Sequence, residues 1–278
     1  MPDRGSIMQP DRTAPRVGAA LSGFAPSVLQ AIPPVLLILA ILALGEWAAR
    51  AGVSPAALPA PSQVARAAVH DAGALVEQTL PTLLVAIYGC IAATLVSLLL
   101  AFAVYAIRGI ETTVMTCAAV LSSIPIMAIA PMLLIWMGPS VITRIAITAV
   151  ICVFPILVSV VQGIRAVGER LDELFVVMAA SPWQRFTRLA LPVSVPYLFV
   201  GLRIAAPLSI LGALVAEWNG ADTGLGVIMI NAMFSLQIDR LWTTVGVACA
   251  VSLLAYGYVC MIERLAISAD RVVRKASV

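Results

Sequence analysis

The chain has 278 residues, of which 62% are apolar and only 11% are charged, and its formal net charge is +3. Soluble domains carry roughly 45–50% apolar and about 25% charged residues, and a chain of this size cannot hide such an apolar excess from water. The composition therefore excludes a cytosolic enzyme, a secreted disulfide scaffold and a nucleic-acid-binding module, and it predicts a protein of the lipid bilayer.

Six stretches are long and apolar enough to cross a bilayer, which takes about 20 residues of helix. Five of them carry no charge: residues 17–45, 78–107, 112–143, 145–164 and 241–262. The remaining stretch, which is the fifth in chain order, runs from about Tyr197 to Trp218 and includes Arg203. We therefore expect an all-α membrane protein whose six-span domain covers residues 28–266, between a flexible cytoplasmic tail at 1–27 and a second tail at 267–278.

The basic residues predict how the chain is oriented. With both termini in the cytoplasm, the inner segments hold thirteen of the Arg and Lys residues and the outer segments hold four. Inner loops of membrane proteins are enriched in these residues, so both termini are expected to be cytoplasmic. A short helix after Pro61 then lies outside, either on the membrane surface or packed on the bundle, with His70 in solvent.

Prolines interrupt the middle spans. Pro125 and Pro131 lie in the third span, Pro155 in the fourth and Pro207 in the fifth. A proline frees backbone carbonyls, which cavity water or a neighbouring helix can satisfy. These helices therefore either line a transport path, as broken helices do in transporters, or simply contain packing kinks.

Two charged residues belong to the fifth span. Arg203 is expected to snorkel to the inner edge or to bond a neighbouring helix, rather than to contact substrate. Glu217, with Asn219 and the Gly224-Leu225-Gly226 turn, marks the outer mouth between the last two spans. Glu217 is either a gate or partner contact, or an interfacial acid that faces water; we include Glu217 and Asn219 with Pro125 and Pro131 as candidates for the path.

The inner segment 165–192 is too long for a plain connector. A helix is expected up to about Ala180, and Ser181-Pro182 favours the start of a second one, because Ser caps helices and Pro suits their first turn. The second helix places Trp183, Phe186 and Leu189 on one side, beside a stripe formed by Arg185 and Arg188. Such a face suits docking to a protein, and it also suits lying on anionic lipid.

At this point the sequence resembles the permeases of ATP-binding-cassette importers. Their signature reads E-A-A, three residues, G, nine residues, I-x-L-P, and its positions are taken here by Glu173-Leu174-Phe175, Ala179, Leu189 and Leu191-Pro192, with Leu174-Phe175 in place of Ala-Ala and Leu189 in place of Ile. Matches to the nitrate/sulfonate/taurine branch are Leu58–Val64, Pro125–Pro131, Leu134–Gly138, and Ala216-Glu217 followed by Gly224-Leu225-Gly226. These pieces cover about residues 30 to 265 in the family's order.

The resemblance implies the type I importer permease fold, six transmembrane helices with a cytoplasmic coupling-helix loop, in a bacterial inner membrane. It implies a homodimer, two ATPase subunits that carry ATP and Mg and dock on the coupling loop 165–192, and an extracytoplasmic solute-binding protein. The docking residues that it implies are Glu173, Ala179, Ala180, Ser181, Trp183, Arg185, Phe186, Arg188 and Pro192. The solute would be nitrate, a sulfonate, a taurine-like compound or a vitamin precursor.

One departure from the signature has a physical consequence, because Ala179 stands where the family has glycine. In a left-handed turn an alanine costs on the order of 1 kcal/mol. The chain also has no G-x-x-x-x-G-K-[ST] motif, so we expect no catalytic residue, no cofactor and no metal in it. The alternatives are an ion-coupled secondary transporter and an intramembrane enzyme, but the paired acids or metal ligands that they need at mid-membrane depth are not seen.

Overall fold

The computed structural model describes residues 28–53, 55, 58–107 and 109–276, and their regular structure is helical. The chain divides at Pro61 into two compact units. The first contains α1 (Val28–Arg50), whose 23 residues make a rod of about 34 Å, close to the thickness of a bilayer core. The predicted first span begins before these residues, so the count of six spans stays a prediction.

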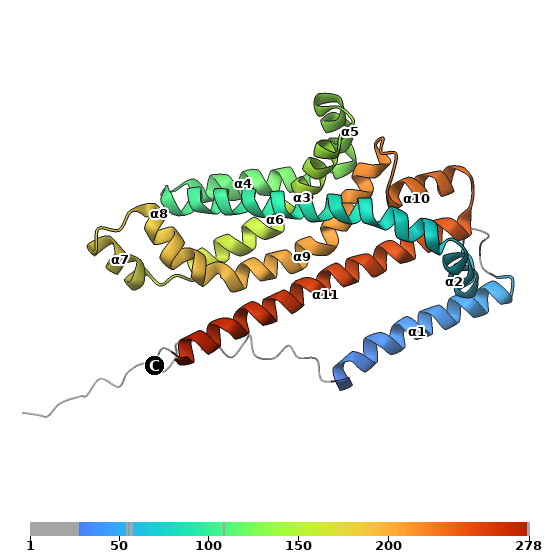
Figure 1. Cartoon of the computed structure of the whole chain (residues 1–278), viewed down its shortest axis with the longest axis horizontal. Helices are drawn as coiled ribbons and strands as arrows, with labels where there is room; N and C mark the ends of the chain where they lie inside the picture. Colours follow the sequence, from blue (N-terminus) through green and yellow to red (C-terminus); the bar gives the residue numbers. More distant parts are fainter. Residues whose placement is uncertain (1–27, 54, 56–57, 108, 277–278) are drawn as a thin grey trace, which may run out of the picture. The chain divides into compact units, whose positions relative to one another are not determined.

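The second unit is a bundle of helices (Figure 1). In chain order it contains α2 (Pro61–His70), α3 (Ala72–Ala106), α4 (Ile110–Ser123), α5 (Ile126–Met137), α6 (Val141–Arg165), α7 (Glu169–Val177), α8 (Pro182–Arg185), the π-helical turn η2 (Phe186–Ala190), α9 (Leu191–Trp218), α10 (Leu225–Phe234) and α11 (Ile238–Ala276). The expected domain boundary at residue 266 falls inside α11.

Helices α3, α6 and α9 pack closely around one core, in which Ile156 and Leu157 of α6 are fully buried. Small residues let their backbones approach. A Cβ atom on Gly89 of α3 would lie 2.4 Å from Thr148 Cγ2, and one on Gly201 of α9 would lie 2.9 Å from the Cα of Ile156. Small residues at contacts are typical of membrane helices, which associate by close packing rather than by a hydrophobic driving force.

Four helices of the described part are long and apolar enough to cross a membrane. They are α3, α6, the continuous helix Pro182–Trp218 and α11 over Ile238–Ala266. The bent pair α4 and α5 raises the number to five if it counts as one span. The predicted all-helical membrane fold is thereby confirmed.

The third predicted span is not one straight helix. Helices α4 and α5 meet at an angle of 95°, at Ile124 and Pro125, and α5 stands away from the bundle (Figure 1). Ile124 is extended, with φ −77° and ψ 127°, because the ring of the following proline disfavours the helical conformation. The expected break at Pro125 is confirmed, whereas Pro131 lies inside α5 without ending it.

The fifth span begins earlier than the sequence suggests. Pro192 and Pro196 do not separate it from the preceding short helix, since α8, η2 and α9 form one helix from Pro182 to Trp218. In η2 the Leu191 N–H donates to the Phe186 carbonyl, five residues earlier. Such a π-helical adjustment directly before Pro192 lets a helix accommodate a proline.

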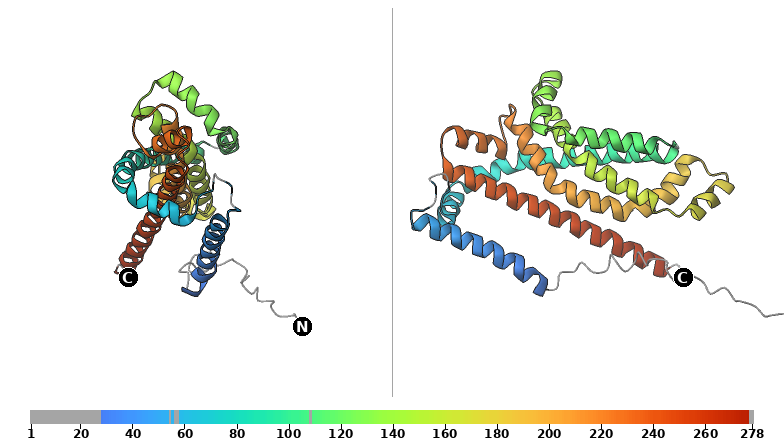
Figure 2. Two further views of the ribbon diagram at one scale, coloured as in Figure 1. Left: turned by 90° about the vertical axis from the view of Figure 1, so that its right-hand side faces the viewer. Right: turned by 180° about the vertical axis from the view of Figure 1, so that it is seen from behind.

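Helices α7 and α8 lie at one end of this unit and α10 lies at the other (Figures 1 and 2). The residues singled out by the sequence are therefore divided between two distant regions. We call residues 169–190 the elbow, and the opposite region the α10 end.

Candidate functional site

The bend of the elbow is made by two helix caps. Helix α7 ends in a Schellman motif, in which the Ala179 N–H donates to the Val176 carbonyl (2.9 Å) and the Ala180 N–H to the Phe175 carbonyl (3.0 Å). This motif needs a left-handed residue, and Ala179 has φ 56°. The position at which the family has glycine is thus in a left-handed turn here, the case for which the cost of alanine was given above.

Helix α8 starts where Ser181-Pro182 predicted. Ser181 Oγ accepts a hydrogen bond from the Gln184 N–H (3.2 Å), and the Ser181 N–H donates to Gln184 Oε1 (2.9 Å). This reciprocal capping box satisfies two backbone groups that would otherwise be unpaired. The chain therefore reverses direction within a few residues.

A charged cluster ties the elbow together and to the bundle. The Arg185 Nε donates to Asp172 Oδ1 of α7 (3.2 Å), and a second guanidinium nitrogen donates to Oδ2. The hydroxyl of Tyr105, at the end of α3, donates a hydrogen bond to the same carboxylate. The guanidinium carbon of Arg185 lies over the Tyr105 ring, 5.5 Å from the ring centroid. Arg185 thus works inside the elbow and is not part of a free basic stripe.

An aromatic cluster makes a second connection to α3. The ring of Phe102 lies 5.1 Å from Trp183 and 5.2 Å from Phe186, edge to face. Phe186 is 4% exposed, so the expectation that it contacts a docking partner disagrees with its position. The face of α8 and η2 that carries it turns toward α3, because two aromatic rings of α3 are there to receive it.

The exposed surface of the elbow includes an apolar patch on the turn side. Val177 is 83% exposed and Met178 is 68% exposed. We define the elbow tip by its exposed apolar side chains, which are Leu174, Val176, Val177, Met178 and Trp183. The signature reads Val176, Val177 and Met178 as an unspecified gap, although a run of apolar residues before a helix end could have pointed to them.

The six remaining residues of the predicted docking set lie around the elbow tip. Glu173, Ala179, Ser181, Arg188 and Pro192 are exposed and Ala180 is half-buried. The elbow therefore brings together the exposed members of the predicted docking set, while Arg185 and Phe186 anchor it from behind.

The α10 end is held by three side chains. Gln78 Oε1 accepts from the Gly224 N–H (2.6 Å), Thr82 Oγ1 from the Leu225 N–H (2.9 Å) and Glu217 Oε2 from the Gly226 N–H (2.7 Å). These N–H groups at the start of α10 have no partner within the helix. We call this arrangement the α10 clamp.

Glu217 is only 1% exposed, so the alternative that it is an acid facing water is wrong. Its second oxygen, Oε1, is buried without a hydrogen-bond partner. A Cβ atom on Gly224 would lie 2.2 Å from Glu217 Cδ, and Gly224 has φ 125°. The expected tight turn is therefore present, and its glycine is what gives the carboxyl group room.

The four path candidates do not share one cavity. Pro125 and Pro131 are exposed on the α4–α5 arm, and Glu217 is part of the clamp. Asn219 donates to the Val215 carbonyl (2.7 Å) and lines a cavity next to α6. Whether any of them contacts solute stays a prediction.

Arg203 bonds a neighbouring helix. Its Nε lies 3.4 Å from Glu263 Oε2 of α11, and both side chains are largely buried. The favoured expectation of an interhelical contact is confirmed, and it explains how the fifth span carries a cation, since a charge inside a membrane bundle needs a partner.

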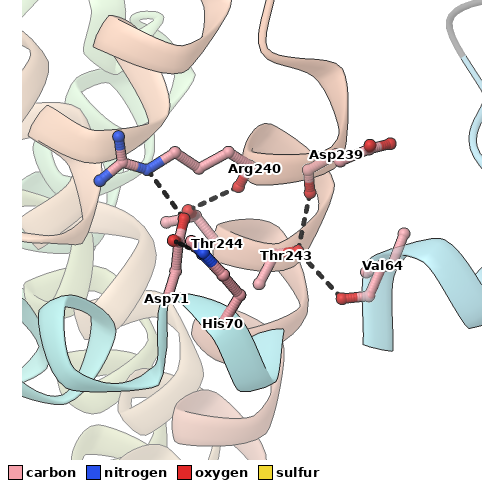
Figure 3. Close-up of polar contacts among 7 residues, drawn as sticks. All are labelled: Val64, His70, Asp71, Asp239, Arg240, Thr243 and Thr244. Carbon is pink, nitrogen blue, oxygen red and sulfur yellow. Dashed lines mark hydrogen bonds and ion pairs between the residues drawn. The ribbon is translucent and has the colours of Figure 1, made fainter. Parts of the chain in front are cut away.

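A polar joint connects α11 to the junction of α2 and α3 (Figure 3). Asp71 pairs with the Arg240 Nε (3.2 Å) and with His70 (2.9 Å), and Thr243 Oγ1 donates to the Val64 carbonyl (3.2 Å). The His70 side chain is 88% exposed, as expected. Helix α2 thus touches the bundle at this joint, but none of its residues is buried, and the choice between the two predicted possibilities stays a prediction.

Several apolar spans with a rigid, protruding apolar elbow define a multi-pass helical membrane protein that offers a surface to a partner. Residues 93–266 match the family described as "Binding-protein-dependent transport system inner membrane component". The chain belongs to this family of importer permeases, the membrane-spanning subunits of ATP-binding-cassette importers, and such permeases work with an ATPase and a solute-binding protein.

Individual relatives differ in solute. A formylaminopyrimidine transport permease of Halalkalibacterium halodurans is 29% identical over 85% of this chain and 95% of its own length. A riboflavin transport permease of Chloroflexus aurantiacus is 28% identical over 84% of this chain and 87% of its own length. A putative aliphatic sulfonates permease of Escherichia coli is 32% identical over 45% of this chain and 47% of its own length.

Proposed function

We propose that this chain forms half of a solute path in a bacterial inner membrane, as a homodimer, and that the elbow tip docks on the ATPase. ATP and Mg would bind to that partner, and this chain would itself carry no catalytic group. Both termini would face the cytoplasm, which puts the elbow on the ATPase side and the α10 end outside. The solute would be a small polar compound, either an anion such as nitrate or a sulfonate, or a vitamin precursor.

The observation that carries this proposal is an exposed apolar tip on a rigid support. Val177 and Met178 are well exposed, while Asp172, Arg185 and Phe102 hold the elbow to itself and to α3. A movement of the tip would therefore be passed to a helix of the bundle. The alternative, an elbow lying on anionic lipid, needs a basic stripe, and the pairing of Arg185 inside the elbow leaves only Arg188 of that stripe exposed.

The homodimer is supported by the arm formed by α5. Ile135 is 81% exposed and Trp136 is 74% exposed, and the arm stands off the bundle (Figure 1). A second copy of the chain would cover such an arm within the membrane.

Removing the apolar character of the tip tests the docking. In Val177→Asp, a charge replaces the centre of the contact, so we expect the ATPase subunits to be lost when the permease is purified from membranes. Val69→Asp is the matched control, because Val69 is 80% exposed on α2, away from the elbow. Equal recovery of the ATPase with both variants, at equal membrane abundance, would contradict the assignment.

A further inference from the structure

A polar cavity of about 280 Å³ lies at the α10 end. It is enclosed by α5, the first turn of α6 and the turn that follows α9. The lining residues are Leu134, Pro139, Ser140, Thr143, Arg144, Ile147, Ala216, Asn219, Gly220 and Asp222. The volume would admit a small solute together with some water.

Arg144 is the unusual member of this lining. It is half-buried, and among the residues that the structure describes it makes no hydrogen bond or ion pair with its side chain. A guanidinium offers five N–H donors, and other arginines of this unit, such as Arg185, Arg203 and Arg240, have carboxylate partners. A partly buried arginine that lines a cavity, with no hydrogen bond or ion pair to its guanidinium and only a longer-range electrostatic interaction with Glu217, can bind an acceptor from outside the chain.

The position of Arg144 in α6 also favours the binding of a negatively charged acceptor. Helix α6 begins at Val141, with Ser140 as its cap, so Arg144 lies in the first turn. A cation is unfavourable there, because the start of a helix carries a partial positive charge. The guanidinium and the helix start together favour a negative group in the cavity, and an anion there would offset both.

The nearby acids do not pair directly with the guanidinium. Glu217 interacts with Arg144 electrostatically, but it forms no ion pair with it and does not line the cavity, since one of its carboxyl oxygens accepts from the Gly226 N–H. Asp222 is exposed in the lining, and it forms no ion pair with Arg144 in the part of the chain that the structure describes. Asn219 is uncharged, and its side-chain amide donates a hydrogen bond to the Val215 carbonyl.

We infer that this cavity binds one oxoanion group, such as a carboxylate, sulfonate or nitrate, through the guanidinium of Arg144. The inference rests on the proposed transport function, and it names the charged group of the solute that the α10 end receives. Planar or tetrahedral oxoanions match the arginine fork with two parallel hydrogen bonds. The same chemistry is offered by the headgroup of an anionic lipid, and the experiment separates the two.

The test uses the full chain purified with its ATPase in nanodiscs of zwitterionic lipid. Sodium methanesulfonate is titrated at constant ionic strength, and the thermal unfolding midpoint is followed, because a ligand of the folded state raises it. We expect saturable stabilisation of the wild type, at least about tenfold weaker apparent affinity in Arg144→Gln and an intermediate effect in Arg144→Lys. Arg66→Gln, which removes an exposed arginine of α2, should behave as the wild type does.

Each other outcome decides against the inference. Equal stabilisation of Arg144→Gln and Arg66→Gln, or none of the wild type, would overturn the site. Asp222→Asn should bind as well or better, and a loss of binding would overturn the assignment of an anion. Loss of the methanesulfonate effect when phosphatidylglycerol is included would identify a lipid as the occupant and overturn the assignment to solute.

The two proposals fail separately. A chain that keeps its ATPase through purification and shows no response to the anion would lose this inference alone. A chain that captures no ATPase, is reconstituted alone in the same nanodiscs and still responds to the anion through Arg144 would keep the site and lose the docking function.

Discussion

At the scale of single residues, Ala179 adopts a backbone conformation that lowers the stability of the folded chain. It occupies the left-handed position of a Schellman motif with φ 56°, where a Cβ atom is unfavourable by about 1–2 kcal/mol. Both hydrogen bonds of the motif are nevertheless formed. The elbow therefore keeps its turn through its caps and anchors, in spite of the residue at its corner.

Ala179→Gly should stabilise the protein. Glycine removes the steric penalty but adds freedom to the unfolded chain, so the net gain expected is about 0.5–1 kcal/mol, seen as a higher thermal unfolding midpoint in detergent. Ala166→Gly serves as the control, because Ala166 ends α6 with φ −72°, and there glycine can only leave stability unchanged or lower it. A midpoint that falls in Ala179→Gly would contradict the reading of the turn.

Also at this scale, sequence reasoning found Glu217 and Arg203 but placed only Arg203 correctly. An interior cation needs a partner wherever it lies, so an interhelical bond could be expected for Arg203. The burial of Glu217 depends on the α10 turn folding back onto it, with Gln78 and Thr82 supplied by α3, far away in the chain. No local pattern around residue 217 carries that information.

At the scale of elements, α10 is fixed by its first turn. Three side chains from two helices accept its leading N–H groups, and Leu225 beneath them is fully buried. There is no space for a side chain between Glu217 and the backbone at positions 224 and 226. The clamp can therefore form only because Gly224 and Gly226 have no side chains. The start of α10 is thus bound to α3 and α9 as one piece.

Gly224→Ala should disrupt the clamp. The new Cβ atom would overlap the carboxyl group of Glu217, and φ 125° is unfavourable for alanine, so we expect a loss of about 2 kcal/mol or more. The measurement is the thermal midpoint and the yield of monodisperse protein. Gly246→Ala is the control, since its Cβ atom would meet nothing within 4 Å and alanine favours a helix; equal midpoints in the two variants would refute the clamp.

Element boundaries were predictable where the signal is local. Ser181-Pro182 starts a helix, and Pro125 breaks one, because a cap and a proline ring act on the adjacent backbone. The start of the fifth span, predicted at about Tyr197, was placed too late, because the π-helical turn η2 lets one helix run through Pro192. The inward face of α8 could not be read either: Trp183 and Phe186 are both apolar, and only the rings of α3 decide that Phe186 is buried.

At the scale of the whole molecule, the membrane class followed from composition alone, since apolar excess is a property of the entire chain. The division of labour between the two ends did not, because it depends on how α3, α6 and α9 are packed. The elbow lies at one end and α10 at the other (Figure 2). The side chains of the clamp and the Arg144 cavity belong to the α10 end. Helix α3 touches both, through Phe102 and Tyr105 at one end and Gln78 and Thr82 at the other.

Because α3 contacts both ends of the bundle, we propose that a separate ATPase acts on the bundle through the elbow tip. A photo-crosslinking amino acid placed at position 177, in otherwise native membranes, tests it most directly. We predict a covalent adduct with the ATPase subunit from position 177 and none from position 69 on α2. An unmodified ATPase beside efficient crosslinking of position 177 to lipid would contradict the claim.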